Sequence, residues 1–564
     1  MDKSRQTDAG TGNKPNNKNL ENKNSELDYY VWVEKAVDTL KEKNLKKHVI
    51  DGMWTPSGFF HIGNSRAELL IPSFVAKRLK EEGMQVEHNF IMDDFDDFDK
   101  IPAGIDVDKK EFEQYLGKPL KDVPSPVKGF KSWVDYFADG VVPLVREFGA
   151  EPKIRSSYAS YKEGHYDEAI KSVLDNAAEI RKIWKDVTKA DKPKDWLPIM
   201  VVCENCGRSS TTKVMSWDGE YVEYICNHDR EYAKACRHIG KVKPVNGKAK
   251  LPWRLHWPAT WKIYGTTFET GGKDHFAAGS SVDTGRAFCK HIFKCEPPFQ
   301  IPTEFLVVDG KKLSGSSGNV ISLRDWLDFA EPELLRFMMI SYKPQTVINF
   351  DLHSNKFFLL ADRYGEAERA YFGKKDEKEN SLEKRDRQLI ELYKLSQINK
   401  IADTMPVQLD YSNAVIAMQT FPNMQIKGLA EILHAKEWIH KKTLNDYDRE
   451  RLAKRLQLAK NWLDKYAPDD VKFTVQEKVP EGLKLSQKEK DALHEVAKVL
   501  REKEWKQQEL FNEFYNICQK TEVKNTDFFR AAYNVLLNKD RGPKLAPFIL
   551  VLGKEKVAGL FEGA

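Results

Sequence analysis

The chain has 564 residues, enough for several domains that each bury a hydrophobic core. It is 41% hydrophobic and 31% charged, and a formal net charge of only +5 excludes a uniformly basic nucleic-acid coat. No apolar run is long enough for a membrane span. Residues 1–25 are polar and lack the apolar centre of a secretory signal, so we expect a disordered tail and a cytoplasmic location.

The first elements after the tail follow the order helix, strand, turn, helix, strand. Residues 28–47 have the apolar spacing of a helix, and 48–55 form the short apolar run of a buried strand. The Pro-Ser-Gly sequence at 56–58 ends that strand in a turn. A helical pattern then runs to about Gly83, and a second strand is expected at 85–92. This order predicts an α/β fold with a Rossmann-type, doubly wound parallel sheet.

An irregular stretch interrupts this α/β pattern. Residues 93–250 mix helical segments with a cluster of cysteines, and we interpret them as an insertion. The sheet is expected to resume at 252–270 and again at 301–308. The α/β domain with its insertion is therefore predicted to span 26–330.

The C-terminal half is predicted to be helical. Long, charged amphipathic segments such as 491–518 carry apolar residues at helical spacing. We expect a connecting stem at 331–370 and an all-α domain at 371–564. No internal repeat is evident.

The run TPSGFFHIGN at 55–64 lies where the first strand passes into a helix, the place where open α/β sheets bind nucleotides. A helix N-terminus offers free backbone N–H groups and a positive dipole to phosphate. Gly58 and Gly63 would let the backbone approach ATP closely, and His61 and Asn64 could point toward it from one face. The alternative is an ordinary Pro-Gly turn with a helix-capping Asn.

A second run, DGKKLSGSSGN at 309–319, follows an expected strand and is rich in Gly, Ser and Lys. A mobile loop of this kind can fold the ammonium groups of Lys311 and Lys312 and the hydroxyl of Ser314 over a triphosphate. A flexible linker is the alternative, because Gly/Ser-rich loops usually serve as linkers. The chain has no Walker A pattern, which excludes a P-loop nucleotide site.

Together these runs resemble the HIGH and KMSKS signatures of class I aminoacyl-tRNA synthetases. His61–Asn64 stands for HIGH and Lys312–Ser316 for KMSKS. Between them GGKDH at 271–275 is similar to the segment with which that class holds the adenosine ribose. Within the class, PSGFFHIGN, GGKDHFAAGSSVDTGR and KKLSGSSGNVISL most resemble class I lysyl-tRNA synthetases, and the resemblance covers roughly 30–553.

The resemblance implies an ATP-dependent ligase. It would activate L-lysine to lysyl-adenylate with release of pyrophosphate, with Mg²⁺ accompanying ATP, and then charge the 3′ end of tRNA(Lys). The implied catalytic residues are His61, Asn64, Lys312 and Ser314. The implied ATP-binding residues are Pro56, Ser57, Gly58, His61, Gly63, Asn64, Gly272, Asp274, Lys311 and Lys312. The implied lysine-binding residues are Thr55, Trp253, His275 and, as a further candidate, Glu68.

Three positions depart from the family pattern. Gly315 stands where many class I enzymes have the second lysine of the loop, Ser317 where lysine-specific members often have Lys, and His256 where the family often has Asp. A class I synthetase for glutamate and a non-catalytic tRNA-binding relative remain alternatives. A small-molecule nucleotidyltransferase is a third, although such enzymes would not need the long helical half.

Four of the seven cysteines fall in one short stretch: Cys203, Cys206, Cys226 and Cys236. Two thiolates two residues apart can chelate one tetrahedral ion, so the sequence predicts a structural Zn²⁺ knuckle at 200–240. His228 and His238 compete for the second half of the site, and four reduced thiols without metal are the alternative. The other cysteines are interpreted as scattered buried thiols: Cys289, Cys295 and Cys518.

Two further clusters carry no assigned chemistry. The aspartates of 93–99 are expected either in a solvated loop or at the rim of the active site. In the helical half, which the resemblance implies to be an anticodon-binding domain, Phe528, Phe529 and Arg530 are of the type that stacks on unpaired bases. Core packing is the alternative for both phenylalanines.

Overall fold

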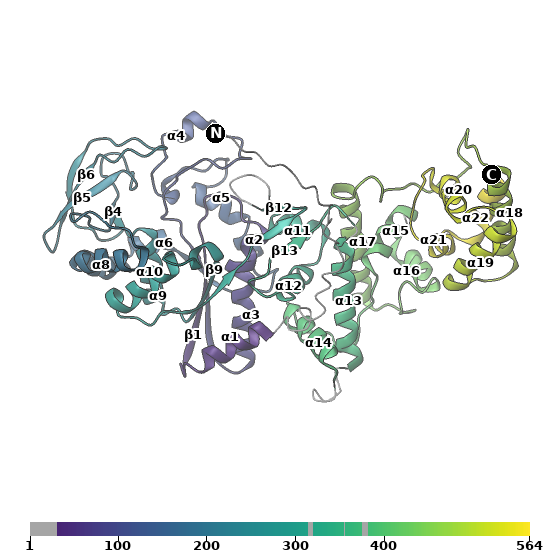
Figure 1. Cartoon of the computed structure of the whole chain (residues 1–564), viewed down its shortest axis with the longest axis horizontal. Coiled ribbons are helices and arrows are strands. Elements are labelled where there is room, and N and C mark those ends of the chain that lie inside the picture. Colours follow the sequence, from purple (N-terminus) through teal and green to yellow (C-terminus); the bar gives the residue numbers. More distant parts are fainter. Residues whose placement is uncertain (1–30, 314–319, 355, 375–381, 423) are drawn as a thin grey trace, which may run out of the picture.

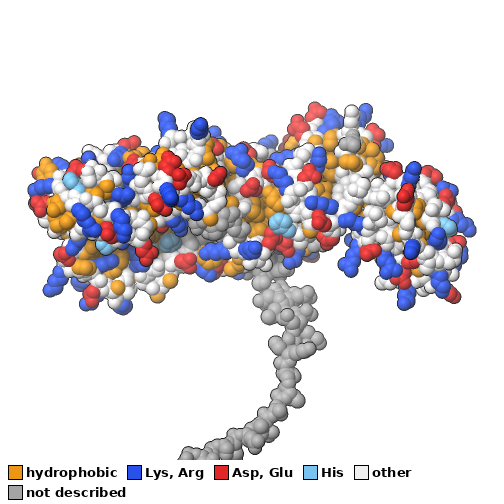
Figure 2. Space-filling model, turned by 90° about the horizontal axis from the view of Figure 1, so that it is seen from above, with side chains coloured by type: hydrophobic (Ala, Val, Ile, Leu, Met, Phe, Trp, Pro, Cys, Tyr) orange, Lys and Arg blue, Asp and Glu red, His pale blue; other side chains and the backbone are white. Residues whose placement is uncertain are grey.

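The computed structural model describes residues 31–313, 320–354, 356–374, 382–422 and 424–564. An α/β half occupies the left of Figure 1 and a helical half extends to its right. On the face seen in Figure 2, basic and acidic side chains are interspersed along the molecule, as the small net charge leads one to expect. Among the described residues, no helix is both long and apolar enough to cross a lipid bilayer.

The main sheet has five parallel strands in the order β10-β9-β1-β2-β3. The strands are β1 Lys47–Trp54, β2 Gln85–Met92, β3 Lys153–Ser156, β9 Phe268–Gly272 and β10 Phe299–Thr303. The chain leaves β1 toward β2 on one side and returns to β9 on the other, so a topological switch point lies beside β1. In open α/β sheets, ligands bind at the carboxyl ends of the strands at such a point. The predicted α/β fold with a parallel sheet is confirmed.

The segment after β1 is helical, as predicted, but one π-helical turn interrupts it. It comprises α2 Ile62–Ser65, a π-helical turn η1 Arg66–Leu70 and α3 Ile71–Glu81. The π turn lies directly against β1, because a Cβ atom at Gly52 would be only 1.9 Å from the carbonyl oxygen of Glu68. Glycine at position 52 is therefore required for this close approach, and π turns of this kind often mark functional sites.

Further helices belong to this α/β half, and one of them replaces a predicted strand. They are α1 Val31–Lys41, α9 Trp253–Tyr264 and α10 Ser281–Phe288. The prediction of sheet throughout 252–270 is wrong for its first half, which is α9. Trp253, Trp257 and Trp261 recur every fourth residue on that helix, so their spacing indicated a helix although the stretch is as apolar as a buried strand.

The stretch between β2 and β9, interpreted as an insertion, also supplies β3 of the main sheet; the rest of it contains short helices and two small antiparallel sheets. Its helices are α4 Lys109–Glu113, α5 Trp133–Asp139, α6 Ser157–Lys162, α7 Asp167–Asp175 and α8 Ala177–Thr188. Its small sheets pair β4 Met200–Val201 with β8 Ala249–Lys250, and β5 Thr212–Trp217, β6 Val222–Cys226 and β7 Ile239–Val242 with one another.

The interpretation of Cys289 and Cys295 as separate thiols is wrong, because they form a disulfide. A second π turn, η5 Cys289–Phe293, is followed by Lys294 in the left-handed backbone region at φ 52°. This reversal brings Cys295 back beside Cys289, a geometry that the six-residue spacing did not reveal. Cys518 is a buried free thiol, as predicted.

A third small sheet is formed by β11 Leu306–Val308, β12 Lys311–Lys312 and β13 Ile348–Phe350, and the helical half begins between β12 and β13. The next helices are α11 Leu323–Phe329, α12 Pro332–Ile340, α13 Lys356–Lys374, α14 Lys384–Ser396, α15 Tyr411–Thr420, α16 Ile426–Ala435 and α17 Asp446–Lys465. The last five are α18 Gln487–Glu502, α19 Gln507–Lys520, α20 Asn525–Leu537, α21 Leu545–Leu552 and α22 Lys554–Glu562, and they enclose a hydrophobic core of their own. The helical pattern of 491–518 is thus divided between two helices.

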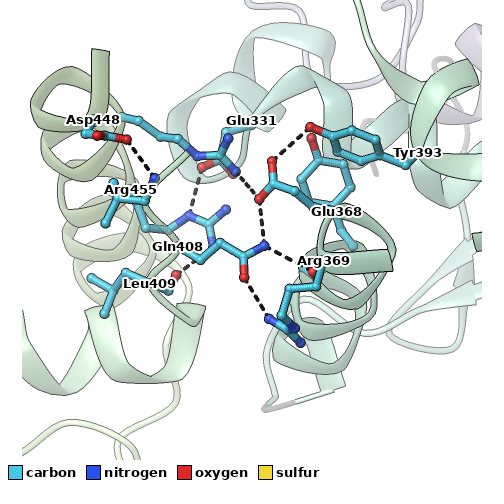
Figure 3. A network of polar contacts seen from close by, with 12 residues as sticks. Glu331, Glu368, Arg369, Tyr393, Gln408, Leu409, Asp448 and Arg455 are labelled. Carbon is cyan, nitrogen blue, oxygen red and sulfur yellow. Dashed lines mark hydrogen bonds and ion pairs between the residues drawn. The ribbon is translucent and has the colours of Figure 1, made fainter. Parts of the chain in front are cut away.

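A buried polar network joins the helices between the two halves (Figure 3). The Glu368 carboxylate on α13 accepts hydrogen bonds from the Tyr393 hydroxyl (3.0 Å), the Gln408 amide (2.7 Å) and the Arg451 guanidinium (2.8 Å). Because three donors satisfy this buried charge, the network stabilises the packing of α13, α14 and α17.

Candidate active site

A pocket of about 640 Å³, partly open to solvent, lies at the carboxyl end of β1, beside the switch point. Its walls come from the turn after β1, from α2 and η1, from the start of α9, from β9 and from the segment that leads to β12. Most of the predicted site residues line it: Thr55, Ser57, Gly58, His61, Gly63, Asn64, Glu68, Trp253, Gly272, His275 and Lys312.

His61 and Asn64 form a reciprocal cap at the start of α2. The Asn64 backbone N–H donates to His61 Nδ1 (3.1 Å), and the His61 backbone N–H donates to Asn64 Oδ1 (3.3 Å). The predicted helix-capping alternative for Asn64 is therefore present, yet both residues also line the pocket. A Cβ atom at Gly63 would lie 2.9 Å from His61 Nδ1, so glycine at position 63 leaves room for this ring.

The His61 imidazole presents a neutral hydrogen-bond donor. Burial, reinforced by the nearby Lys312 cation, lowers the pKa of His61 to about 4. The ring is therefore uncharged at neutral pH, and because Nδ1 accepts a hydrogen bond, its proton resides on Nε2. Such an Nε2–H group can donate to a phosphate oxygen without changing the charge of the site.

Glu68 places an incompletely satisfied carboxylate in the pocket. Its Oε1 accepts a hydrogen bond from the Asn64 side-chain amide (3.3 Å), while its Oε2 is buried and has no hydrogen-bond partner among the described residues. Burial raises the pKa of the Glu68 carboxyl to about 8. A buried carboxylate without a cation is costly, so this group is suited to receive a positively charged ligand.

Aromatic rings line the wall formed by α9. The Trp253 ring is stacked on Trp257 (centroids 5.1 Å apart) and meets His275 at a centroid distance of 5.7 Å. Burial lowers the pKa of His275, and the Trp253 indole N–H is buried without a hydrogen-bond partner among the described residues. An aromatic face and an unused N–H donor together suit an amino-acid ligand that carries both a cation and a carboxylate.

Lys312 enters the pocket from β12. Its Nζ lies 3.2 Å from the centroid of the Phe305 ring, which also lines the pocket. Arg66 ties the two motifs together, because its buried guanidinium donates to the carbonyl oxygens of Glu304 (3.0 Å) and Thr346 (2.9 Å). The helix that begins at the HIGH-like motif is thereby attached to the segment that leads to Lys312.

Three predicted residues that the structure describes do not line the pocket, and a fourth cannot be placed. Pro56 is buried in the turn, Lys311 and Asp274 are exposed, and Ser314 lies outside the described residues, as do Gly315 and Ser317. Asp274 follows Gly272 and precedes His275, both of which line the pocket, so its turn borders the cavity.

The expectation of a solvated loop at 93–99 is wrong for its first aspartates. Asp93 and Asp94 are buried, and the Lys250 ammonium donates to Asp96 (2.9 Å). Asp96 also lines the pocket, which agrees with the alternative that this cluster shapes the active-site rim. His256 packs behind it with its Nδ1 3.0 Å from the Tyr161 hydroxyl, and burial lowers the pKa of His256 to about 3.

The cysteine cluster is compact. The sulfur atoms of Cys203, Cys206, Cys226 and Cys236 lie within 4.8 Å of one another. The Cys203–Cys236 pair is 3.6 Å apart and the Cys206–Cys226 pair 3.9 Å. A tetrahedral ion with Zn–S bonds of about 2.3 Å requires sulfur–sulfur distances of about 3.8 Å, so the donor set fits zinc. His228 and His238 are not part of this group.

Comparison with known proteins identifies the family. A model described as tRNA synthetases class I (K) matches residues 30–399, well over half of the chain. The chain belongs to this family. A model described as Anticodon binding domain matches residues 433–559. Similar curated proteins are named lysine–tRNA ligase: those of Methanocaldococcus jannaschii (35% identical, 94% of this chain and 100% of the relative), Thermococcus kodakarensis (34%, 93% and 97%) and Methanococcus maripaludis (33%, 93% and 97%).

In this class I synthetase, most residues of the two motifs that the structure describes line one pocket, but sequence reasoning missed other residues that line or border it. Phe305 and Glu304 precede a weak strand and carry no motif, and Arg66 gave no sign that it joins two distant segments. Asp96 was noticed only as one member of a charge run. A basic residue inside an apolar helical pattern was the one signal that could have pointed to Arg66.

Proposed function

We propose that the chain is an ATP-dependent lysine–tRNA ligase. It joins the lysine carboxylate to the α-phosphate of ATP, releases pyrophosphate, and then transfers the lysyl group to the 3′-terminal ribose of tRNA(Lys). The relatives support this activity because they match almost the full length of the chain. The observation that carries the choice of lysine is the carboxylate of Glu68, whose Oε2 lacks a partner among the described residues.

Catalysis rests on positioning and charge stabilisation, because the carboxylate of the amino acid is itself the nucleophile. The His61 Nε2–H and the Asn64 amide are proposed to contact the ATP phosphates at the start of α2. Lys312, with its β12 neighbour Lys311 and with Ser314 two residues later in the chain, is proposed to neutralise the leaving pyrophosphate. The turn at Ser57 and Gly58 is proposed to bind the nucleotide together with Gly272. Asp274 is proposed to bind its ribose.

The lysine substrate is proposed to bind between η1 and α9. The Glu68 carboxylate would receive an ammonium group, while the Trp253 indole and the His275 ring enclose the aliphatic chain. Thr55 would contact the polar end of the substrate. Glutamate fits less well, because an acidic side chain would face Glu68 and no arginine occurs among the described residues that line the pocket.

Magnesium is expected with ATP. Two pocket carboxylates are already paired, Asp96 with Lys250 and Glu304 with Lys273 (both 2.9 Å). Mg²⁺ binds well through phosphate oxygens and water with few protein ligands, so it is proposed to enter on the ATP phosphates. It would shield the negative charge of the triphosphate.

The cysteine cluster is proposed to bind structural zinc through Cys203, Cys206, Cys226 and Cys236. Four protein ligands leave no open coordination position, so the ion would stabilise the insertion and take no part in the reaction. We also propose the division into a catalytic part at 26–330 with an insertion at 93–250, a stem at 331–370 and an anticodon-binding part at 371–564. A cytoplasmic location follows from the proposed role in translation.

The proposal is tested by lysine-dependent exchange of pyrophosphate into ATP, in the presence of tRNA(Lys) and Mg²⁺. His61→Ala and Lys312→Ala should each reduce the exchange rate by roughly 100-fold or more, as the loss of one transition-state contact does. Lys290→Ala removes an exposed lysine outside the pocket and should leave the rate unchanged. Tight tRNA binding without exchange for any amino acid would instead favour the non-catalytic alternative.

A further inference from the structure

Two lysine ammonium groups meet at one aromatic ring in the wall of the active-site pocket. Lys312 Nζ lies 3.2 Å from the centroid of the Phe305 ring, and Lys273 Nζ lies 4.9 Å from the same centroid. Lys273 comes from the turn η4 Lys273–Phe276, which follows β9, whereas Lys312 comes from β12. Phe305 lines the pocket, and the face of an aromatic ring attracts cations. The ring therefore gathers two positive charges, of which the proposed reaction uses only Lys312.

Glu304 holds Lys273 in this position. Its Oε1 accepts a hydrogen bond from Lys273 Nζ (2.9 Å), and its Oε2 accepts one from the Phe305 backbone N–H (3.3 Å). The backbone of Glu304 is itself fixed at both ends. Its carbonyl oxygen accepts a hydrogen bond from the buried Arg66 guanidinium (3.0 Å), and its N–H donates to the Pro344 carbonyl (2.9 Å). The Lys273 ammonium is thus attached through Glu304 to a fixed part of the pocket wall.

The Lys273 ammonium can bind an anion while it stays on Glu304. A protonated lysine has three N–H donors, and among the described residues Lys273 donates one hydrogen bond, to Glu304. Its side chain is 43% exposed. Because an ion pair this exposed is weak, a phosphate oxygen can share the ammonium group with the Glu304 carboxylate.

The lining of the pocket carries little positive charge for a reaction that releases a polyanion. The described lining residues include two lysines, Lys100 and Lys312, and three carboxyl side chains. The leaving pyrophosphate concentrates the negative charge of two phosphate groups, and preorganised cations stabilise such developing charge. Lys100 comes from the segment after β2, whereas Lys273 shares the Phe305 ring with Lys312. Lys273 is therefore the better placed second cation.

We infer that Lys273 is a further catalytic residue, which donates an N–H to an oxygen of the pyrophosphate as it leaves. The inference rests on the proposed function. The bond that forms joins the lysine carboxylate to the α-phosphorus, and the bond that breaks joins the α-phosphorus to the pyrophosphate oxygen. Lys273 acts as a point charge and transfers no proton. Glu304 is a positioning residue, because it acts on the phosphates through Lys273.

The test measures the KM for pyrophosphate in the tRNA-dependent exchange assay, with the full chain and Mg²⁺-pyrophosphate as the probe. Lys273→Ala should raise this KM by roughly 10- to 150-fold and lower the exchange rate by roughly 100-fold. Lys273→Arg keeps the positive charge and should recover much of the affinity. Lys213→Ala is the matched control, because Lys213 is 52% exposed, forms an ion pair of 2.8 Å with Asp195 and does not line the pocket.

Two further measurements distinguish contact with pyrophosphate from support of the pocket wall. Inhibition by AMP, which lacks the β- and γ-phosphates, and the KM for lysine should be the same in Lys273→Ala as in the unmodified chain. Glu304→Gln removes the ion pair but keeps the ammonium group, so it should weaken pyrophosphate binding much less than Lys273→Ala does. An unchanged pyrophosphate KM in Lys273→Ala, equal defects in these two variants, or an equal loss of AMP and pyrophosphate affinity would overturn the inference.

The same assay separates this inference from the proposed function. Normal exchange by Lys273→Ala, together with loss of exchange in Lys312→Ala, would overturn the role of Lys273 and leave the proposed function standing. A pyrophosphate defect in Lys100→Ala in place of Lys273→Ala would also overturn that role. Absence of exchange by the unmodified chain with every amino acid would overturn both the inference and the proposed function.

Discussion

The pKa of Glu68 predicts how lysine binding depends on pH. Burial raises this pKa to about 8 in the unliganded pocket, so the carboxyl is mostly protonated at pH 6 and half-ionised at pH 8. An ammonium group binds the ionised form, so the KM for lysine should fall as pH rises through this range. For a group of pKa 8 the ionised fraction increases roughly 50-fold between pH 6 and pH 8, and the KM should fall by a similar factor.

The assay is tRNA-dependent pyrophosphate exchange at saturating ATP, with the lysine KM determined at half-unit steps of pH. The lysine side-chain ammonium, with an ordinary pKa of about 10.4, stays charged throughout. His61 does not contribute, because burial holds its pKa near 4. Asp93 and Glu269 also have pKa values raised by burial to about 8, but neither lines the pocket.

A Glu68→Gln variant isolates the carboxylate from those two groups. It keeps the side-chain size and should raise the lysine KM at pH 8 by roughly 10- to 150-fold, which corresponds to a charged hydrogen bond of about 1.5–3 kcal/mol. Its lysine KM should not follow pH between 6 and 8, and its KM for ATP should remain close to that of the unmodified chain. A lysine KM that is flat with pH in the unmodified chain, or a pH profile that survives in Glu68→Gln, would refute this reasoning.

Three further predictions test other parts of the structure. Gly63→Ala forces a Cβ toward the His61 ring and should lower kcat/KM for ATP by roughly 100-fold, while circular dichroism shows an unchanged fold. Glu368→Ala leaves the half-buried Arg451 guanidinium without this buried carboxylate and should reduce the free energy of unfolding by about 3 kcal/mol, measured by urea denaturation. A loss below about 1 kcal/mol contradicts the account of Figure 3. Metal analysis should find about one zinc ion per chain, and Cys203→Ser should lose it and lower the Tm; a chain fully folded without metal contradicts the zinc assignment.

The elements that were predicted well have strong local signals. The strand at 85–92 has the predicted bounds, and the first strand is displaced by one residue, because each is a short stretch with several apolar residues that is bounded by turn residues. The described residues of the HIGH-like motif line the pocket together, because His61 and Asn64 cap each other within one turn of helix. The geometry of such a motif is determined by residues that are close together in the sequence.

The features that were missed depend on residues far apart in the chain. Nothing near Glu68 reveals that its carboxylate is buried, since that follows from the packing of the π turn against Gly52. The sequence places Asp94 in a charged loop. In the structure, its carboxylate accepts hydrogen bonds from the Ser156 hydroxyl and the Tyr158 backbone N–H, and these donors are far away in the sequence. The sequence predicts a strand where α9 lies, because tryptophan and leucine occur in both helices and strands when an apolar run is short.

The most direct test of the central claim is charging of tRNA(Lys) by the purified chain, supplied with ATP and Mg²⁺ and with each of the twenty amino acids in turn. The pocket predicts lysyl-tRNA as the product, and Glu68→Gln should reduce its formation far more at low lysine concentration than at saturation. Glutamyl-tRNA as the main product, or lysine charging that is indifferent to Glu68→Gln at every lysine concentration, would contradict the account of how this pocket selects its substrate.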